Sequence, residues 1–256
     1  MEILNHKITL KTSGLIQELL NGFSNPVEFQ PIKNIPNPLK VNNLGGLDFS
    51  NPKLYTIYLS LKLKDEVFEA NVLHELRHIW QIEHFYPHVC NKVIVYQNND
   101  SDFFQDLGSH IQSQILDIDV NNWLLSKGYS LNYFENMRKD FLNLQNPLDY
   151  PLLDDKYNFA QLVSPHMFTF YYMSNEDIMK HINKFSSSYE KYKNALYVAN
   201  EIKEFLFELD LSNTCDCFIV MGEILTRLNL WDKYYIFFKD TKIRTLTEFE
   251  SFKATL

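Results

Sequence analysis

Cysteine and glycine are both scarce in this chain of 256 residues, which contains 3 Cys and 7 Gly. Three cysteines are too few for the disulfide framework of a small secreted protein, so we expect a reducing, cytoplasmic environment. The N-terminus has no basic flank followed by a continuous apolar core, and a signal peptide is not expected. Because no run of about 18 apolar residues occurs, we expect no membrane span.

Positive charge is also in short supply. Lys and Arg number 24 against 32 Asp and Glu, which gives a net charge of −8. The sequence has no basic stripe long enough to follow a phosphate backbone, so direct nucleic-acid binding is disfavoured. Hydrophobic residues make up 45 % of the chain, which is sufficient for the core of a globular protein.

The pattern along the chain predicts an α+β fold in which helices dominate. Residues 1–53 contain a short amphipathic segment and a stretch rich in Pro, Asn and Gly, which favours loops with short strands. Residues 54–61 alternate, are rich in β-branched and aromatic side chains, and predict a strand. The later pattern is mainly helical and is interrupted at prolines such as Pro165. We therefore expect a metal-binding core with a loop-rich N-terminal segment over 1–130 and a helical region over 131–256.

One short motif specifies chemistry. Residues 74–78 read HELRH, an HExxH motif inside a helix-patterned run. Residues four apart lie on one face of a helix, so His74 and His78 project side by side and can hold one Zn²⁺ through two imidazole nitrogens. Glu75 lies beside them, where its carboxylate can take a proton from a zinc-bound water. Arg77 is expected to face away from the metal, at the surface.

A catalytic zinc needs a third protein ligand and a fourth position for water. Residues 101–126 predict a second long helix that carries Asp117 and Asp119, two carboxylates that point to different sides. His110 shares a helical face with Asp117 and is a further candidate.

His84 offers a different third ligand. It follows His78 by six residues, the spacing of the metzincin motif HExxHxxGxxH. Gln81 stands where that motif has glycine, and glutamine lacks the freedom at positive φ that lets the chain turn back toward the metal. His84 therefore stays an alternative to the carboxylates.

Residues 117–124 (DIDVNNWL) resemble the ExEANxFA stretch that follows HExxH in ImmA/IrrE-type metallopeptidases. The resemblance covers about residues 54–130 and is gluzincin-like. It implies a zincin-like core with a small sheet beside the HExxH helix. It also implies that Asp117 is the third zinc ligand and that Asn121 supports the ligands without binding the metal itself. Asp stands here where that family usually has Glu.

The resemblance implies a zinc metallopeptidase, a hydrolase that cuts a narrow protein or peptide substrate in the cytoplasm. Zinc would activate water and polarise the scissile carbonyl, with Glu75 as general base. In zincin-type metallopeptidases an extended substrate pairs with the edge of the strand that leads into the HExxH helix, here strand 54–61. An open groove beside this strand with a free coordination position would favour the enzyme, whereas a covered groove would favour a non-enzymatic role. Tyr171, Tyr172 and His166 are candidates for stabilising the oxyanion. The alternative is a non-enzymatic, metal-containing binding or sensing module on the same scaffold. Glu75 favours the enzyme, because metal binding alone does not need this residue.

Overall fold

The structure of the protein is a computed structural model that describes residues 1–34, 45–92, 99–149, 153–185 and 187–256. It is 59 % helical and 14 % strand, which confirms the predicted α+β fold. The chain divides into two compact units. The first contains Met1–Phe85 and Val120–Tyr133, and the second contains Tyr86–Asp119 and Phe134–Leu256.

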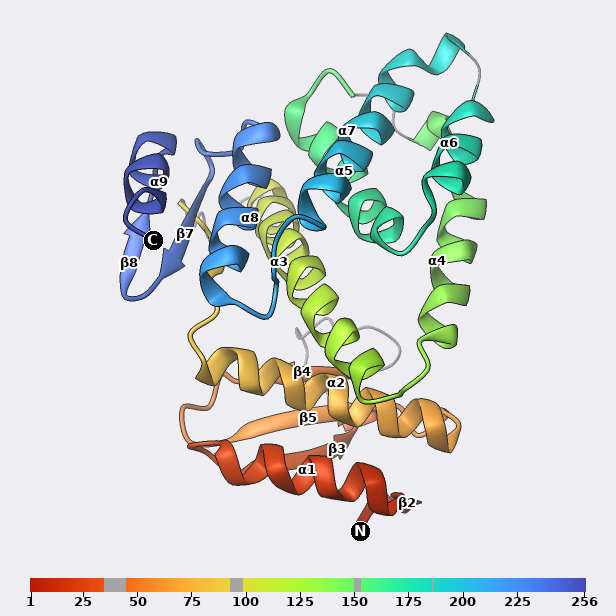
Figure 1. The fold of residues 1–256 in the computed structure, drawn as a ribbon, viewed down its shortest axis with the longest axis vertical. Coiled ribbons are helices and arrows are strands. Elements are labelled where there is room, and N and C mark those ends of the chain that lie inside the picture. The colour runs from red at the N-terminus through yellow and green to blue at the C-terminus, as the bar shows by residue number, and fades with distance from the viewer. Residues whose placement is uncertain (35–44, 93–98, 150–152, 186) are drawn as a thin grey trace. The chain divides into compact units, whose positions relative to one another are not determined.

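The first unit combines a three-stranded sheet with helices (Figure 1). Its elements are β1 (Glu2–Ile3), β2 (His6–Lys7), α1 (Leu10–Gly22), β3 (Val27–Pro31), a 3₁₀ turn (Ile32–Asn34), β4 (Gly45–Asp48), β5 (Tyr55–Leu59) and α2 (Asp65–Glu83). The sheet order is β3-β5-β4, with β3 parallel and β4 antiparallel to β5. Helix α2, which carries the HExxH motif, packs against α1, β4 and β5.

Local sequence explains why these elements form. Thr9 caps α1 because its side chain accepts a hydrogen bond from the Thr12 amide. Asp65 and Glu66 occupy the first turn of α2, where the helix dipole favours negative charge. The alternating pattern in β5 places Ile57 and Leu59 in the core.

The second unit is mainly helical and ends with a small sheet. Its elements are β6 (His88–Asn91), most of α3 (Asn99–Ser126), α4 (Asn132–Leu144), α5 (Lys156–Tyr171), α6 (Asn175–Asn183), α7 (Glu190–Leu206), α8 (Thr214–Arg227), β7 (Tyr234–Phe238), β8 (Thr241–Ile243) and α9 (Leu246–Lys253), with 3₁₀ turns at Pro147–Asp149 and Ser187–Tyr189. Strands β6, β7 and β8 form an antiparallel sheet in that order. Helix α5 packs along α7. The expected interruption at Pro165 is wrong, because this proline lies inside α5.

Aromatic side chains form the core beneath α9. The Phe218 ring of α8 stacks on Phe238 of β7 at 5.0 Å between centroids and lies 5.3 Å from Phe249 of α9. Gly222 on α8 provides the space, since a Cβ there would overlap the Phe249 ring. The scarce glycine thus allows α8 and α9 to approach closely.

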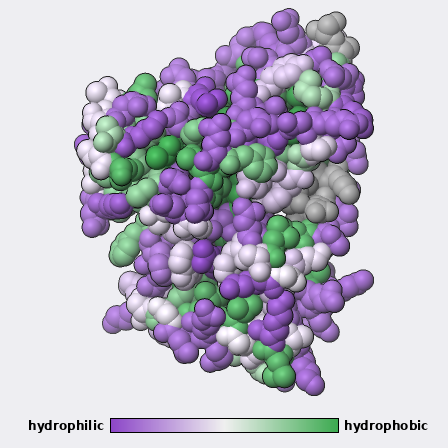
Figure 2. Space-filling view, in the orientation of Figure 1, coloured by the Kyte–Doolittle hydropathy of each residue, from purple (hydrophilic) through white to green (hydrophobic). Residues whose placement is uncertain are grey.

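The surface is mostly polar. Figure 2 shows a face on which hydrophilic side chains predominate, with smaller hydrophobic areas between them. Among the described helices, none combines the length and the apolar character that crossing a membrane requires.

Candidate metal centre

The two histidines of the motif lie in the middle of α2 and face each other. His74 and His78 have Nε2 atoms 3.1 Å apart and ring centroids 4.7 Å apart, with the ring planes at 81°. Two imidazole nitrogens bound to one tetrahedral zinc lie about 3.3 Å apart, because each Zn–N bond is about 2.0–2.1 Å long. The i, i+4 spacing therefore gives a nitrogen pair of the right separation for one ion.

Gln81 fixes the orientation of the second ring. The Nδ1–H of His78 donates to Gln81 Oε1 at 2.8 Å. A hydrogen bond at the outer nitrogen of a metal-binding histidine holds the ring and directs the other nitrogen toward the ion. Gln81 occupies the glycine position of the metzincin motif, and its contact with His78 makes it a supporting residue of the candidate site.

A carboxylate completes the donor set. One ligand atom each from His74, His78 and Asp117 lies within 4.8 Å of the others. Asp117 belongs to α3, one turn before the residues of this continuous helix that form part of the first unit. His74 is buried, while the other two side chains are half-buried, so an ion at this position keeps an approach from solvent.

Asp119 does not join this group. Its side chain is 3 % exposed. It lies near Cys217 of α8, whose pKa is raised first by burial and then by the charge of Asp119. Two residues along a helix rotate the side chain by about 200°, which separates Asp119 from the direction of Asp117.

The histidine alternatives also lie elsewhere. His84 follows the end of α2, is exposed, donates from Nδ1 to the Trp80 carbonyl at 2.7 Å and stacks on the Trp80 ring. His110 is exposed, and its Nε2 accepts a hydrogen bond from Gln114 at 2.7 Å. Within the described ranges, neither residue belongs to a group of three metal donors.

Glu75 lies beside the histidines and against the start of β4. Its side chain is 5 % exposed. A Cβ built on Gly45 would lie 3.1 Å from Glu75 Oε1 and 2.6 Å from Nδ2 of the Asn71 side chain. Only glycine permits this close approach of a strand backbone to the motif. Sequence analysis missed Gly45, although the pair Gly45-Gly46 in a chain poor in glycine was a signal.

The expectation that an extended substrate pairs with the edge of strand 54–61 is wrong, because β5 is the central strand of its sheet. Its two edges are occupied by β3 and β4. The strand that ends the sheet on the side of Glu75 is β4, which pairs only with β5 among the described strands.

Arg77 is buried, which contradicts its expected surface position. Its guanidinium carbon lies 3.5 Å from the Trp80 ring centroid and 5.6 Å from that of Trp123. Arg77 thus packs α2 against the part of α3 that belongs to the first unit, through cation–π contacts that are strongest when desolvated.

The candidates for stabilising the oxyanion lie in α5 or at its C-terminal end. His166 has no exposed surface, and its Nδ1–H donates to the Leu162 carbonyl at 2.7 Å. It is therefore inaccessible to a substrate. Tyr171 and Tyr172 are half-buried, and Tyr171 stacks on Phe207 at 4.6 Å between centroids.

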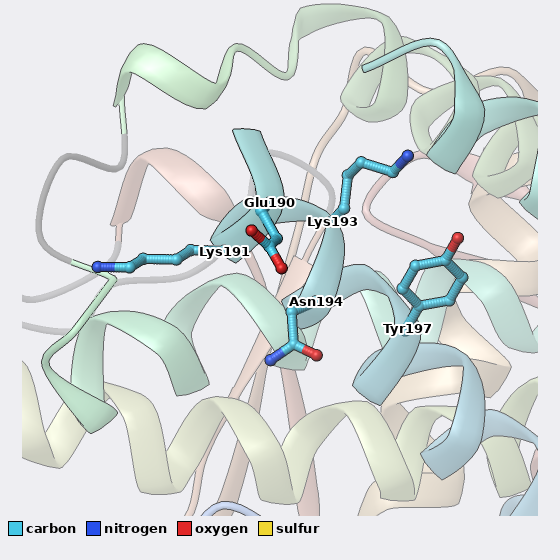
Figure 3. Close-up of a pocket in the computed structure, with 5 residues that line it drawn as sticks. All are labelled: Glu190, Lys191, Lys193, Asn194 and Tyr197. Atoms are coloured by element: carbon cyan, nitrogen blue, oxygen red, sulfur yellow. The ribbon is translucent and has the colours of Figure 1, made fainter. Parts of the chain in front are cut away.

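A surface hollow of about 960 Å³ lies along α7 in the second unit, lined by Glu190, Lys191, Lys193, Asn194 and Tyr197 (Figure 3). Its charges are of both signs, and Lys191 pairs with Asp154 at 2.5 Å. No group of three metal donors among the described residues lies in this hollow. The group of three potential metal donors among the described residues lies instead on α2 and α3.

Comparisons with models of protein families, with curated proteins and with solved structures found no match to this chain.

Proposed function

We propose that this protein is a zinc-dependent hydrolase that cuts peptide bonds in a narrow range of protein substrates. The observation that carries the proposal is the convergence of two imidazole nitrogens and a carboxylate beside a buried glutamate. Two nitrogens and one oxygen form a donor set that suits Zn²⁺ with one open position. The same donors also suit Fe(II), but the adjacent glutamate, which is not needed as a ligand, favours hydrolysis.

When bound, the ion would supply a Lewis acid that activates water and polarises a carbonyl. The chain's own residues supply the remaining chemistry. Glu75 accepts a proton from the attacking water and delivers it to the leaving amine. Its burial excludes bulk water from this transfer.

The edge of β4 supports the choice of a peptide as substrate. An extended peptide can add to a sheet edge through main-chain hydrogen bonds. Gly45, the first residue of β4, lies against Glu75. A peptide bond held along this strand would therefore lie near the proton-transferring carboxylate.

The proposal is tested first by the metal content of the purified protein. We expect one zinc per chain in the wild type and in Asp119→Ala, and strong loss in Asp117→Ala. Asp119→Ala is the matched control, because it removes a carboxylate from the same helix two residues away. A wild type that carries no zinc would refute the proposal.

Cleavage is tested separately with Glu75→Gln, which should keep its zinc. Wild type and variant are incubated with a denatured proteome, and new peptide ends are mapped by mass spectrometry. We expect ends that depend on Glu75. Zinc binding without such ends would instead support the metal-containing binding or sensing module.

A further inference from the structure

Two carboxylates flank the HExxH motif on α2, each separated from it by the same number of residues. Glu69 lies five residues before His74, and Glu83 lies five residues after His78. Fourteen residues span almost four helical turns, so the two glutamates lie within about 40° of each other around the helix axis. His78 lies about 180° from Glu69 by the same reckoning. The metal-binding face and the face with the two glutamates are thus on opposite sides of α2.

Glu69 joins α2 to the start of α1. Its side chain is buried and accepts hydrogen bonds from the Thr9 amide at 2.7 Å, the Thr9 hydroxyl at 2.8 Å and the Thr12 hydroxyl. The Thr12 hydroxyl also lies 2.7 Å from Tyr129 Oη, in the segment that follows α3. All four residues belong to the first unit.

Glu83, the last residue of α2, joins this helix to Ser24, which follows α1, and to Tyr55 of β5. It accepts from the Ser24 amide at 3.2 Å, the Ser24 hydroxyl at 2.6 Å and the Tyr55 hydroxyl at 2.7 Å. Burial raises the pKa of Glu83, but the hydrogen bonds from Ser24 and Tyr55 outweigh it, and the pKa is lowered. The carboxylate is therefore held in its charged form.

We infer that Glu69 and Glu83 are positioning residues that set the rotation of α2, and through it the zinc affinity of the motif. This inference rests on the proposed function. A rotation of about 10° moves an imidazole nitrogen about 7 Å from the axis by about 1 Å, which is more than a metal site tolerates. Charge-assisted hydrogen bonds at both ends of the motif resist such rotation, because they are stronger than neutral ones.

The test compares zinc affinity with stability. Glu69→Gln and Glu83→Gln keep the side-chain shape but present an amide group to donors. We expect each to weaken zinc affinity about tenfold, measured by competition with a chromogenic chelator, as for supporting partners of metal ligands. Glu66→Gln is the matched control, because Glu66 is exposed on the same helix, and its affinity should equal that of wild type.

A conservative pair separates positioning from general stability. Thr12→Ser keeps the hydroxyl that donates to Glu69 and should keep wild-type affinity, whereas Thr12→Val should weaken it. Leu19→Ala, in the core of α1, should lower the melting temperature without changing zinc affinity. Two outcomes overturn the inference: folded Glu69 and Glu83 variants that bind zinc as wild type does, or equal loss in Leu19→Ala. A wild type without zinc would instead refute the proposed function.

Discussion

Each unit contains a pair of neighbouring histidines in its helices, and the two pairs differ in the groups that their rings contact. His74 and His78 lie one turn apart on α2, with facing nitrogens and a carboxylate within reach. His166 of α5 and His181 of α6 come from different helices, with ring centroids 6.0 Å apart. Both pairs include buried rings, so burial alone does not identify a ligand. The convergence of donor atoms distinguishes the first pair.

The second pair is surrounded by aromatic rings. His166 lies 5.1 Å from Phe141 and 5.7 Å from Phe170 between centroids, and His181 lies 5.4 Å from Phe185. Burial lowers the pKa of His166 to about 4. Burial, and then the charge of Lys184, lower that of His181 to about 3. Both rings are therefore neutral core residues at neutral pH.

The largest expected difference between the pairs is in metal affinity. His78→Ala should weaken zinc binding by more than about 100-fold, because it removes a ligand rather than a supporting partner. His166→Asn should leave the affinity within about twofold of wild type, since distant sites act independently. Chelator competition measures both. Equal losses in the two variants would contradict the assignment of the first pair as the metal pair.

The second pair should make stability depend on pH. Its folded pKa values lie below the value of about 6.5 expected in the unfolded chain. The stability contributed by neutral rings is thus complete above pH 6.5 and is lost as pH falls toward the folded pKa values. Each ring should cost about 2 kcal/mol between pH 7 and pH 5.

Urea unfolding at the two pH values checks this expectation. His166→Asn keeps a donor for the Leu162 carbonyl but cannot be protonated, so its pH dependence should be smaller by about 2 kcal/mol. An unchanged dependence would show that His166 does not titrate on unfolding.

The smallest expected effect concerns helix capping. Asp155 caps α5 by accepting from the amides of Tyr157 and Asn158 at 2.9 and 3.2 Å. Asp155→Ala should lower the free energy of unfolding by about 1 kcal/mol without changing zinc affinity. Thr9→Ala removes the cap of α1 and also a donor to Glu69, so it should weaken zinc binding as well. Denaturation and chelator competition on both variants would show whether caps in the two units differ in this way.

Local pattern predicted much of the first unit. The periodicity of α2 and the i, i+4 spacing of its histidines are local properties, and the structure has both. The third donor depends on how α3 approaches α2, which no local pattern contains. The structure brings Asp117 near the histidines, the residue that the family resemblance also indicated, while Asp119 lies near Cys217.

Three expectations failed for reasons of tertiary packing. Arg77 is buried because two tryptophans cover it. Strand β5 is central because the segment before it folds back as β4, which the sequence shows only as a loop-rich stretch. Pro165 stays within α5 because neighbouring helices such as α7 stabilise a turn that lacks one amide donor.

The contact between His78 and Gln81 has a consequence for how a cation enters. Gln81 Oε1 can only accept, so the hydrogen of the His78 ring lies on Nδ1. In a neutral ring, Nε2 of His78 then carries no hydrogen and can only accept. The hydrogen shared by the two Nε2 atoms must then come from His74. A zinc ion at the proposed site and this hydrogen compete for the same lone pairs, so metal binding there requires His74 to change tautomer.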